Sequence, residues 1–270
     1  MQAPDVASPI TFGSAPPAWR VPAAGHILGC ELPHLGLGDR LLLRGLMLLA
    51  RRQIAAVHGL QHVRPAMDPF ILAMNHGTRR ESLLVPALLF LNRGGRLIHF
   101  LADWNFQLIP GVGLIYRRAQ VVTVTRKSAK PRALNGLKPF FRQVLPPFEL
   151  ARAHLLAGRP VGIFPEGTVN RDPDRLLRGR RGAARLSLET GAPIVPMGIR
   201  FPGVEPGSPV PEHAAMELHI GAPLTPPGSP GHRASVGAVS TWHAAIMNEI
   251  ARLSGKAWTT PMKEASHGRS

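Results

Sequence analysis

Several residue types and signals are scarce or missing in this sequence, and each absence excludes a class of protein. The chain has one cysteine, Cys30, so it can form no intramolecular disulfide, and this favours a reducing compartment. Residues 1–34 contain no positively charged region followed by an apolar one, so we expect no secretory signal. No window reaches the about 18 consecutive apolar residues expected of a membrane-spanning helix.

Signatures of nucleic-acid binding and of two common enzyme classes are also missing. Aromatic residues make up 6% of the chain, which is too few for a platform on which single-stranded bases stack. We find no zinc finger, helix-turn-helix or ribonucleoprotein motif. The G-x-S-x-G motif of serine hydrolases and the P-loop of nucleotide-binding proteins do not occur either. We therefore expect no nucleic-acid partner and neither of these enzyme activities.

The histidines of the sequence do not predict a metal site. The 12 histidines are scattered along the chain and Cys30 stands alone. His58 and His62 are four residues apart, but they lack the glutamate of a His-Glu-x-x-His zinc motif. We expect both to be surface or interface residues, and we expect no bound metal.

The charge of the chain is strongly positive, with a net value of +16. Nucleic acid, anionic lipid and phosphorylated substrates are all compatible with it. Only five of the 32 basic residues are lysines, and such an arginine bias also arises from coding composition. Charge alone therefore identifies no partner.

Apolar and β-branched runs predict strands, and amphipathic runs that end at glycine predict helices. The expected strands cover residues 69–76, 96–103, 120–126, 160–164, 193–199 and 216–221. The expected helices cover residues 35–58, 82–91, 146–159, 176–191 and 234–255. Strands that alternate with helices predict an α/β fold in which helices cover the faces of a sheet.

The distribution of proline and glycine suggests how the chain is divided. Residues 1–34 are rich in both, so we expect a flexible leader. One or two N-terminal amphipathic helices are expected at 35–58, a main domain at 59–255 and a tail at 256–270. The leucine-rich run 41–52 ends in two arginines and is typical of a helix that lies on a membrane or packs on a core.

A histidine and a glutamate lie five residues apart in the stretch MNHGTRRESLL. His76 follows a predicted strand, and α/β sheets bind ligands at this end of their strands. A neutral imidazole there could act as a general base if a carboxylate, here Glu81, fixes its tautomer. The alternative role is structural, because Thr78 and Glu81 have the spacing of a capping box at a helix N-terminus. The residues alone leave both roles open.

A second motif, FPEGTVNRD, directly follows the predicted strand at 160–164. Gly167 permits close backbone approach and Thr168 offers a hydroxyl, so this loop is suited to present N–H donors to an anion. Glu166 would repel a phosphate and is better suited to bind a substrate hydroxyl or to position a basic side chain. The alternative is a tight turn with a solvated carboxylate.

Four motifs, in their order along the chain, resemble the glycerophospholipid acyltransferase family. They are NH-x-x-x-x-E at 75–81, the arginine that ends VTVTR, then FPEGT and PIVPMGI. The best-known members of the family resemble 1-acylglycerol-3-phosphate acyltransferases, and the similarity covers roughly residues 57–225. The resemblance implies a mixed sheet flanked by helices, in a peripheral or monotopic protein on the cytoplasmic side of a membrane.

The resemblance also implies an activity and its residues. A fatty acyl group would pass from acyl-CoA or acyl carrier protein to a hydroxyl of a lysophospholipid-like acceptor, with no further cofactor. His76 would be the catalytic base and Glu81 its acidic partner, while N–H groups near Gly77 or in the 165–168 loop would stabilise the oxyanion. The residues that would bind the acceptor are Arg126, Glu166, Gly167 and Thr168, and Pro196 would have a more structural role.

Two residues depart from the family pattern. Glu81 stands where the family usually has aspartate, although related lipid A acyltransferases also carry glutamate. Asp103 lies near a position where lysine is common. These departures leave open a lipid A-like or aminolipid acceptor, and a non-catalytic lipid-binding module that would not need His76 remains the alternative of a different class.

Overall fold

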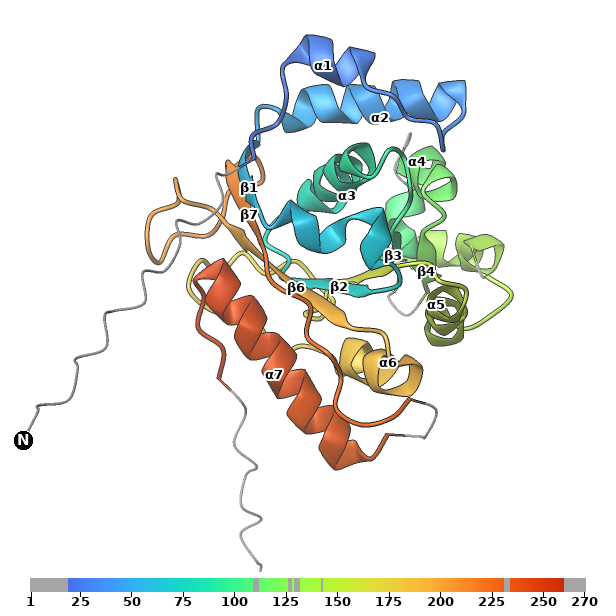
Figure 1. Ribbon diagram of the computed structural model, residues 1–270, viewed down its shortest axis with the longest axis vertical. Coiled ribbons are helices and arrows are strands. Elements are labelled where there is room, and N and C mark those ends of the chain that lie inside the picture. Colours follow the sequence, from blue (N-terminus) through green and yellow to red (C-terminus); the bar gives the residue numbers. More distant parts are fainter. Residues whose placement is uncertain are drawn as a thin grey trace, which may run out of the picture.

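A mixed sheet runs through the middle of the protein (Figure 1). The computed structural model describes residues 19–108, 112–125, 128, 132–141, 143–230 and 234–259. Within these ranges the strands are β1 (Ile54–His58), β2 (Ile71–Met74), β3 (His99–Asp103), β4 (Val122–Val124), β5 (Val161–Ile163), β6 (Ile194–Arg200) and β7 (Met216–Ile220). Their order is β1-β7-β6-β2-β5-β3-β4, and the pair β6–β7 is antiparallel while the other pairs are parallel. The α/β fold with a mixed sheet is confirmed.

Helices cover both faces of this sheet (Figure 1). One layer contains α1 (Ala24–Gly29), α2 (Leu37–Ala50) and α3 (Glu81–Asn92). The other contains α5 (Pro147–Leu156), α6 (Gly182–Thr190) and α7 (Val236–Ser254). The remaining helical segments are α4 (Val112–Arg118) and 3₁₀ turns at Leu60–Val63, Pro65–Met67, Trp104–Leu108 and Arg132–Phe141.

Strand β2 lies inside the sheet and shows why its sequence is continuously apolar. Leu72 and Met74 pack in the core beneath α1–α3, while Ile71 and Ala73 pack in the core beneath α5–α7. All four side chains are fully buried. Alternate residues of a strand point to opposite faces, so a strand covered by helices on both sides needs apolar residues throughout.

The N-terminal part of the chain differs from the prediction of a flexible leader over 1–34. Within the described part of this segment, α1 is formed, and Ile27 and Leu32 are buried in the core. The backbone of Trp19 pairs with Val57 of β1. Burial of these apolar side chains outweighs the local preference of proline and glycine for loops.

Three further boundaries differ from those expected. The helix expected at 35–58 ends at Ala50, and β-branched Ile54 and Val57 are buried in edge strand β1 instead. The helix expected at 176–191 begins at Gly182, after Gly179 adopts a left-handed φ of 75°. The expected tail starts at 256, yet Lys256 is buried.

Helix α2 packs on α3 with one side and leaves another side in solvent. Leu43, Met47 and Ala50 are buried. Leu37, Leu41, Leu48 and Leu49 are exposed. Among the described helices, none is long and apolar enough to cross a membrane. Contact of the exposed leucines with lipid therefore stays a prediction.

Two histidines stack between β3 and α5. The ring centroids of His99 and His154 are 3.8 Å apart and their planes differ by 17°. The pKa of His154 is lowered to about 4, mainly by burial and also by the positive charges of His99 and Arg159. The folded protein therefore favours neutral rings here.

The stacked rings predict a loss of stability in acid. Because the pKa of His154 is lower in the folded than in the unfolded chain, its contribution is present above pH 6.5 and is lost as the pH falls toward 4. We expect the free energy of unfolding in urea to fall between neutral pH and pH about 5. His154→Phe should make this fall smaller, since one titrating group is removed. An unchanged fall in the variant would contradict the assignment.

A close contact in the sheet gives a second prediction. A Cβ atom at Gly162 of β5 would lie 2.4 Å from two ring carbons of Phe100. We expect Gly162→Ala to lower the free energy of unfolding by about 1–3 kcal/mol, because ring or strand must shift. Gly45→Ala is the matched control: a Cβ there has nothing within 4 Å, and alanine favours the helix by about 1 kcal/mol. Urea unfolding measures both, and equal stability of Gly162→Ala and the native protein would refute the contact.

Candidate active site

The structure brings His76 and Glu81 into direct contact. His76 follows β2 by two residues, and Glu81 is the first residue of α3. Nδ1 of His76 lies 2.6 Å from Oε1 of Glu81. Glu81 is fully buried, whereas His76 retains 7% exposure. The carboxylate therefore holds one ring nitrogen and leaves Nε2 as the nitrogen available to a substrate.

The electrostatics of this pair follow from its burial. Desolvation raises the pKa of Glu81, while the hydrogen bond with His76 and the nearby N–H groups of Thr78 and Gly77 lower it. An ionised Glu81 accepts the Nδ1 proton, which fixes the tautomer with a lone pair on Nε2. It would also stabilise an imidazolium formed when Nε2 takes up a proton.

The capping box considered for Thr78 and Glu81 is wrong. Helix α3 begins at Glu81 itself, and its N-cap residue, Arg80, makes no side-chain cap. The hydroxyl of Thr78 is buried without a hydrogen-bond partner in the described part of the chain. Glu81 is therefore not the third residue of a helix capped by Thr78, and its Oε1 contacts Nδ1 of His76.

A distant carboxylate takes the place of the local cap. Oε1 of Glu212, in the β6–β7 connection, accepts the N–H groups of Arg79 and Arg80 at 2.8 and 3.2 Å. Its Oε2 forms an ion pair with Arg171 at 2.5 Å. Negative charge at the N-terminal end of a helix is favourable, so Glu212 supports the turn between His76 and Glu81. This contact joins residues more than a hundred positions apart, so no local pattern predicts it.

Glu166 is a second buried carboxylate, and it fastens the loop that carries His76. Its Oε1 accepts the backbone N–H of His76 at 3.1 Å. Its Oε2 accepts the side chain of Asn170 and the N–H of Leu177, both at 2.8 Å. Both oxygens are thus engaged by the protein, which makes Glu166 a positioning residue for the histidine.

Two asparagines complete this framework. The side chain of Asn75 pairs with both backbone groups of Ile199, accepting its N–H at 2.7 Å and donating to its carbonyl at 3.1 Å. The N–H of Asn170 donates to the carbonyl of His76 at 2.7 Å. Asn170 lies in the stretch FPEGTVNRD, so the motif contained this residue, but only its three-dimensional contacts reveal its role.

The remaining predicted residues have different surroundings. Gly167 adopts a φ of 67°, and a Cβ atom there would lie 2.8 Å from Nε of Arg180. Thr168 is exposed. Pro196 is buried in β6 beside Ala73 and is structural in its contacts. Arg126 lies outside the described residues.

An apolar pocket begins beside the histidine. The rings of His76 and Phe164 are tilted against each other with centroids 4.3 Å apart. Phe164 is part of the wall of a pocket between α2, α3, α4 and β3, whose lining includes Leu43, Leu83 and Ile115. Phe164 therefore contacts both the imidazole of His76 and the interior of this pocket.

Comparisons with known proteins identify the family and support the fold. The family model described as Acyltransferase matches residues 55–200. A curated 1-acyl-sn-glycerol-3-phosphate acyltransferase of Borreliella burgdorferi is 30% identical over 99 residues, which is 37% of this chain and only 34% of that relative. The crystal structure of the 1-acyl-sn-glycerophosphate (LPA) acyltransferase PlsC from Thermotoga maritima matches with a TM-score of 0.53 and 18% identity, over 86% of this chain and 89% of the other. The structural likeness supports the fold.

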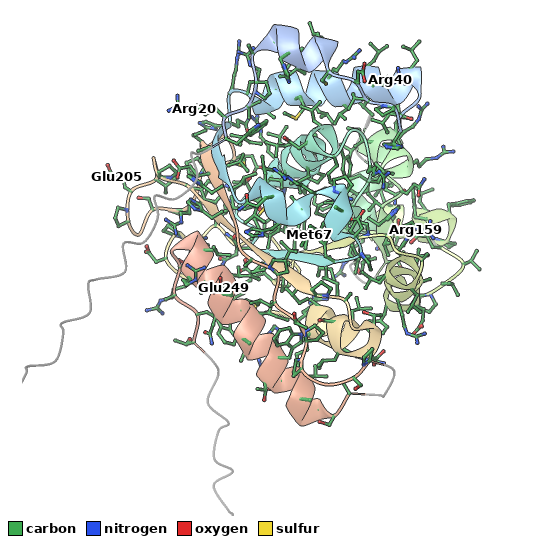
Figure 2. The ribbon with its side chains drawn as sticks, in the orientation of Figure 1. Arg20, Arg40, Met67, Arg159, Glu205 and Glu249 are labelled. Carbon is green, nitrogen blue, oxygen red and sulfur yellow. The ribbon has the colours of Figure 1, made fainter. Side chains whose placement is uncertain are left out.

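The remote cap predicts a local effect of substitution. Glu212→Ala removes the acceptor of two N–H groups, so we expect a loss of about 1 kcal/mol in unfolding free energy. Amide hydrogen exchange of Arg79 and Arg80 should become faster. Glu205→Ala is the matched control, since this glutamate lies on the same connection at the outer edge of the molecule (Figure 2). Exchange that stays slow in Glu212→Ala would refute the cap.

Proposed function

Because the chain belongs to the acyltransferase family, as the resemblance predicted, we propose that it transfers a fatty acyl group from an acyl thioester to a hydroxyl of a lysophospholipid-like acceptor. The observation that carries this proposal is the contact of His76 with Glu81, at the point where Phe164 joins the ring to an apolar pocket. A non-catalytic lipid-binding module would have no use for a histidine whose tautomer is fixed by a buried carboxylate.

In the proposed reaction, Nε2 of His76 removes the proton from the acceptor hydroxyl while the oxygen attacks the thioester carbonyl. The tetrahedral intermediate then collapses, the C–S bond breaks, and the imidazolium returns the proton to the thiolate. Glu81 stabilises the transient positive charge. General base catalysis of this kind contributes about 10²–10⁴-fold. Because the thioester is already activated, no acyl-enzyme is required.

The surroundings narrow the choice of oxyanion donors. The N–H of Gly77 faces Glu81, and the N–H of Gly167 donates to the carbonyl of Phe164 at 2.9 Å. The N–H of Gly167 is thus already engaged. We propose that the oxyanion binds to another N–H of the 165–168 loop.

We propose that the pocket receives the acyl chain of the donor, which is acyl-CoA or acyl carrier protein, and that Arg126 binds the acceptor's phosphate. The names of the Borreliella and Thermotoga proteins support a lysophosphatidate-like acceptor. Glu81, in place of the usual aspartate, keeps a lipid A-like or aminolipid acceptor as the alternative. Neither the donor nor the acceptor needs a further cofactor in this scheme.

We propose that the enzyme works while docked on the cytoplasmic side of a membrane, as a peripheral or monotopic protein. Leu42, Leu43 and Leu46 of α2 line the pocket, and the same helix exposes Leu37, Leu41 and Leu49. A lipid surface against these exposed leucines would let an acyl chain enter without crossing water.

The test replaces the two residues of the proposed pair. Thiol release from acyl-CoA or acyl carrier protein would be followed with lysophosphatidate as acceptor, and lipid products identified by mass spectrometry. We expect His76→Ala to lower the rate by about 10²-fold or more, and Glu81→Gln to lower it less, since the neutral amide still orients the ring but does not stabilise its charge.

His62→Ala is the matched control, because this partly exposed histidine lies outside the site. It should retain the native rate. Thioester consumption at the native rate in His76→Ala would rule out the mechanism. Acylation of an aminolipid or lipid A precursor alone, with no product from lysophosphatidate, would replace the acceptor but keep the mechanism.

A further inference from the structure

Two histidines and a glutamate that are far apart in the sequence meet at the edge of the sheet. His58 ends β1 and is in register with His219 of the parallel strand β7. Glu217 lies two residues before His219, so all three side chains point to one face. The imidazole rings stack with centroids 4.6 Å apart and planes 14° apart.

Within the described part of the chain, the polar side-chain atoms of this cluster have few hydrogen-bond partners. Nε2 of His219 is buried and has no hydrogen-bond partner there. It lies 3.6 Å from Oε2 of Glu217, which is too long for a hydrogen bond. A buried nitrogen without a partner is costly unless something else binds it.

The chemistry of the three groups is that of a transition-metal site. One ligand atom from each residue can be chosen so that all three lie within 4.8 Å of one another. Zinc binds imidazole nitrogen and carboxylate oxygen at about 2.0–2.2 Å, so its ligand atoms lie within about 4 Å of each other. Binding would require side-chain rotations that bring these atoms closer together, and none of the three residues is fully buried. Magnesium and calcium, which prefer oxygen ligands, would not suit two imidazoles.

The surroundings permit a cation despite the basic chain. Arg200 is in register with Glu217 across β6–β7, and its positive charge opposes a metal ion. Its guanidinium, however, donates to the carbonyls of Leu253 and Arg252 at the end of α7, at 2.7 and 3.4 Å. No lysine or arginine forms an ion pair with Glu217 within the ranges that the structure describes.

We propose that His58, Glu217 and His219 form a binding site for one zinc-class divalent ion, which ties β1 to β7. Three protein ligands leave a fourth position for water. The site is separate from His76, because β1 lies three strands from β2, about 14 Å at the usual strand spacing. The proposal is therefore independent of the proposed reaction.

The role that fits this place is structural. β1 is the edge strand that follows α2, and α2 forms a wall of the apolar pocket. An ion that links β1 to β7 would anchor this end of the layer formed by α1, α2 and α3. The ligands come from two strands and are brought together only in the folded chain. Ion binding is therefore coupled to folding.

The experiment uses the full chain, stripped of metal with a chelator. ZnCl₂ is titrated at neutral pH against a chromophoric competitor, and thermal unfolding is recorded with and without the ion. We expect one zinc ion to bind tightly per chain (the tight equivalent), and we expect zinc to raise the melting temperature by several degrees. MgCl₂ at the same concentration should produce neither effect.

Variants separate this site from weak binding by scattered histidines. His219→Ala, and Glu217→Gln, which keeps the side-chain shape, should each weaken the tight equivalent by about tenfold or more and abolish the thermal shift. His62→Ala, which alters a histidine outside the cluster, should bind like the native chain. Absence of a tight equivalent, or a tight equivalent that survives in both cluster variants, would overturn the proposal. Activity is not part of the readout, so failure here leaves the proposed reaction untouched.

Discussion

The contacts of one buried carboxylate hold the proposed catalytic histidine in place. Glu166 joins the loop after β2 to the loop after β5, because it accepts N–H groups from His76 and Leu177 and the side chain of Asn170. Hydrogen bonds to a charged acceptor are about twice as strong as those between neutral groups. A buried charge without such partners would be strongly unfavourable. The contacts that position His76 are therefore among those that stabilise the buried carboxylate of Glu166.

A buried lysine after α7 interacts electrostatically with Glu166. Lys256 is buried, and its Nζ donates to the carbonyl of Asp172 at 2.5 Å. Burial lowers the pKa of Lys256, while Glu166 and Glu81 act in the opposite direction. The next residue, Ala257, pairs through its backbone with Asp174 and Leu176. The segment after α7 thus belongs to the framework of the site, although composition alone placed it in a tail.

The sequence predicted the strands and helices that are determined by their own residues. Continuous apolar runs identified β2, β5 and β6, because strands covered on both faces need apolar residues throughout. The spacing of His76 and Glu81 was informative for a similar reason, since the connecting turn brings the two together. Arg126, Thr168 and the acceptor contacts remain predictions.

Long-range partners were the part that sequence could not reveal. Glu212 caps α3 from the β6–β7 connection, and Glu166 binds the backbone rather than pointing to solvent. Strand β1 and helix α1 also depend on distant surfaces, since short segments of mixed composition form only where a sheet edge or an apolar groove receives them. In each case the stabilising contact is made with residues that lie far away in the sequence.

The two apolar cores on either side of the sheet have a mechanical consequence. The pocket lies on the side of the sheet that is covered by α2, α3 and α4, whereas α6 and α7 pack on the opposite core. The sheet separates these two bodies of side chains. A change in the side chains that line the pocket therefore leaves the core beneath α5, α6 and α7 in place.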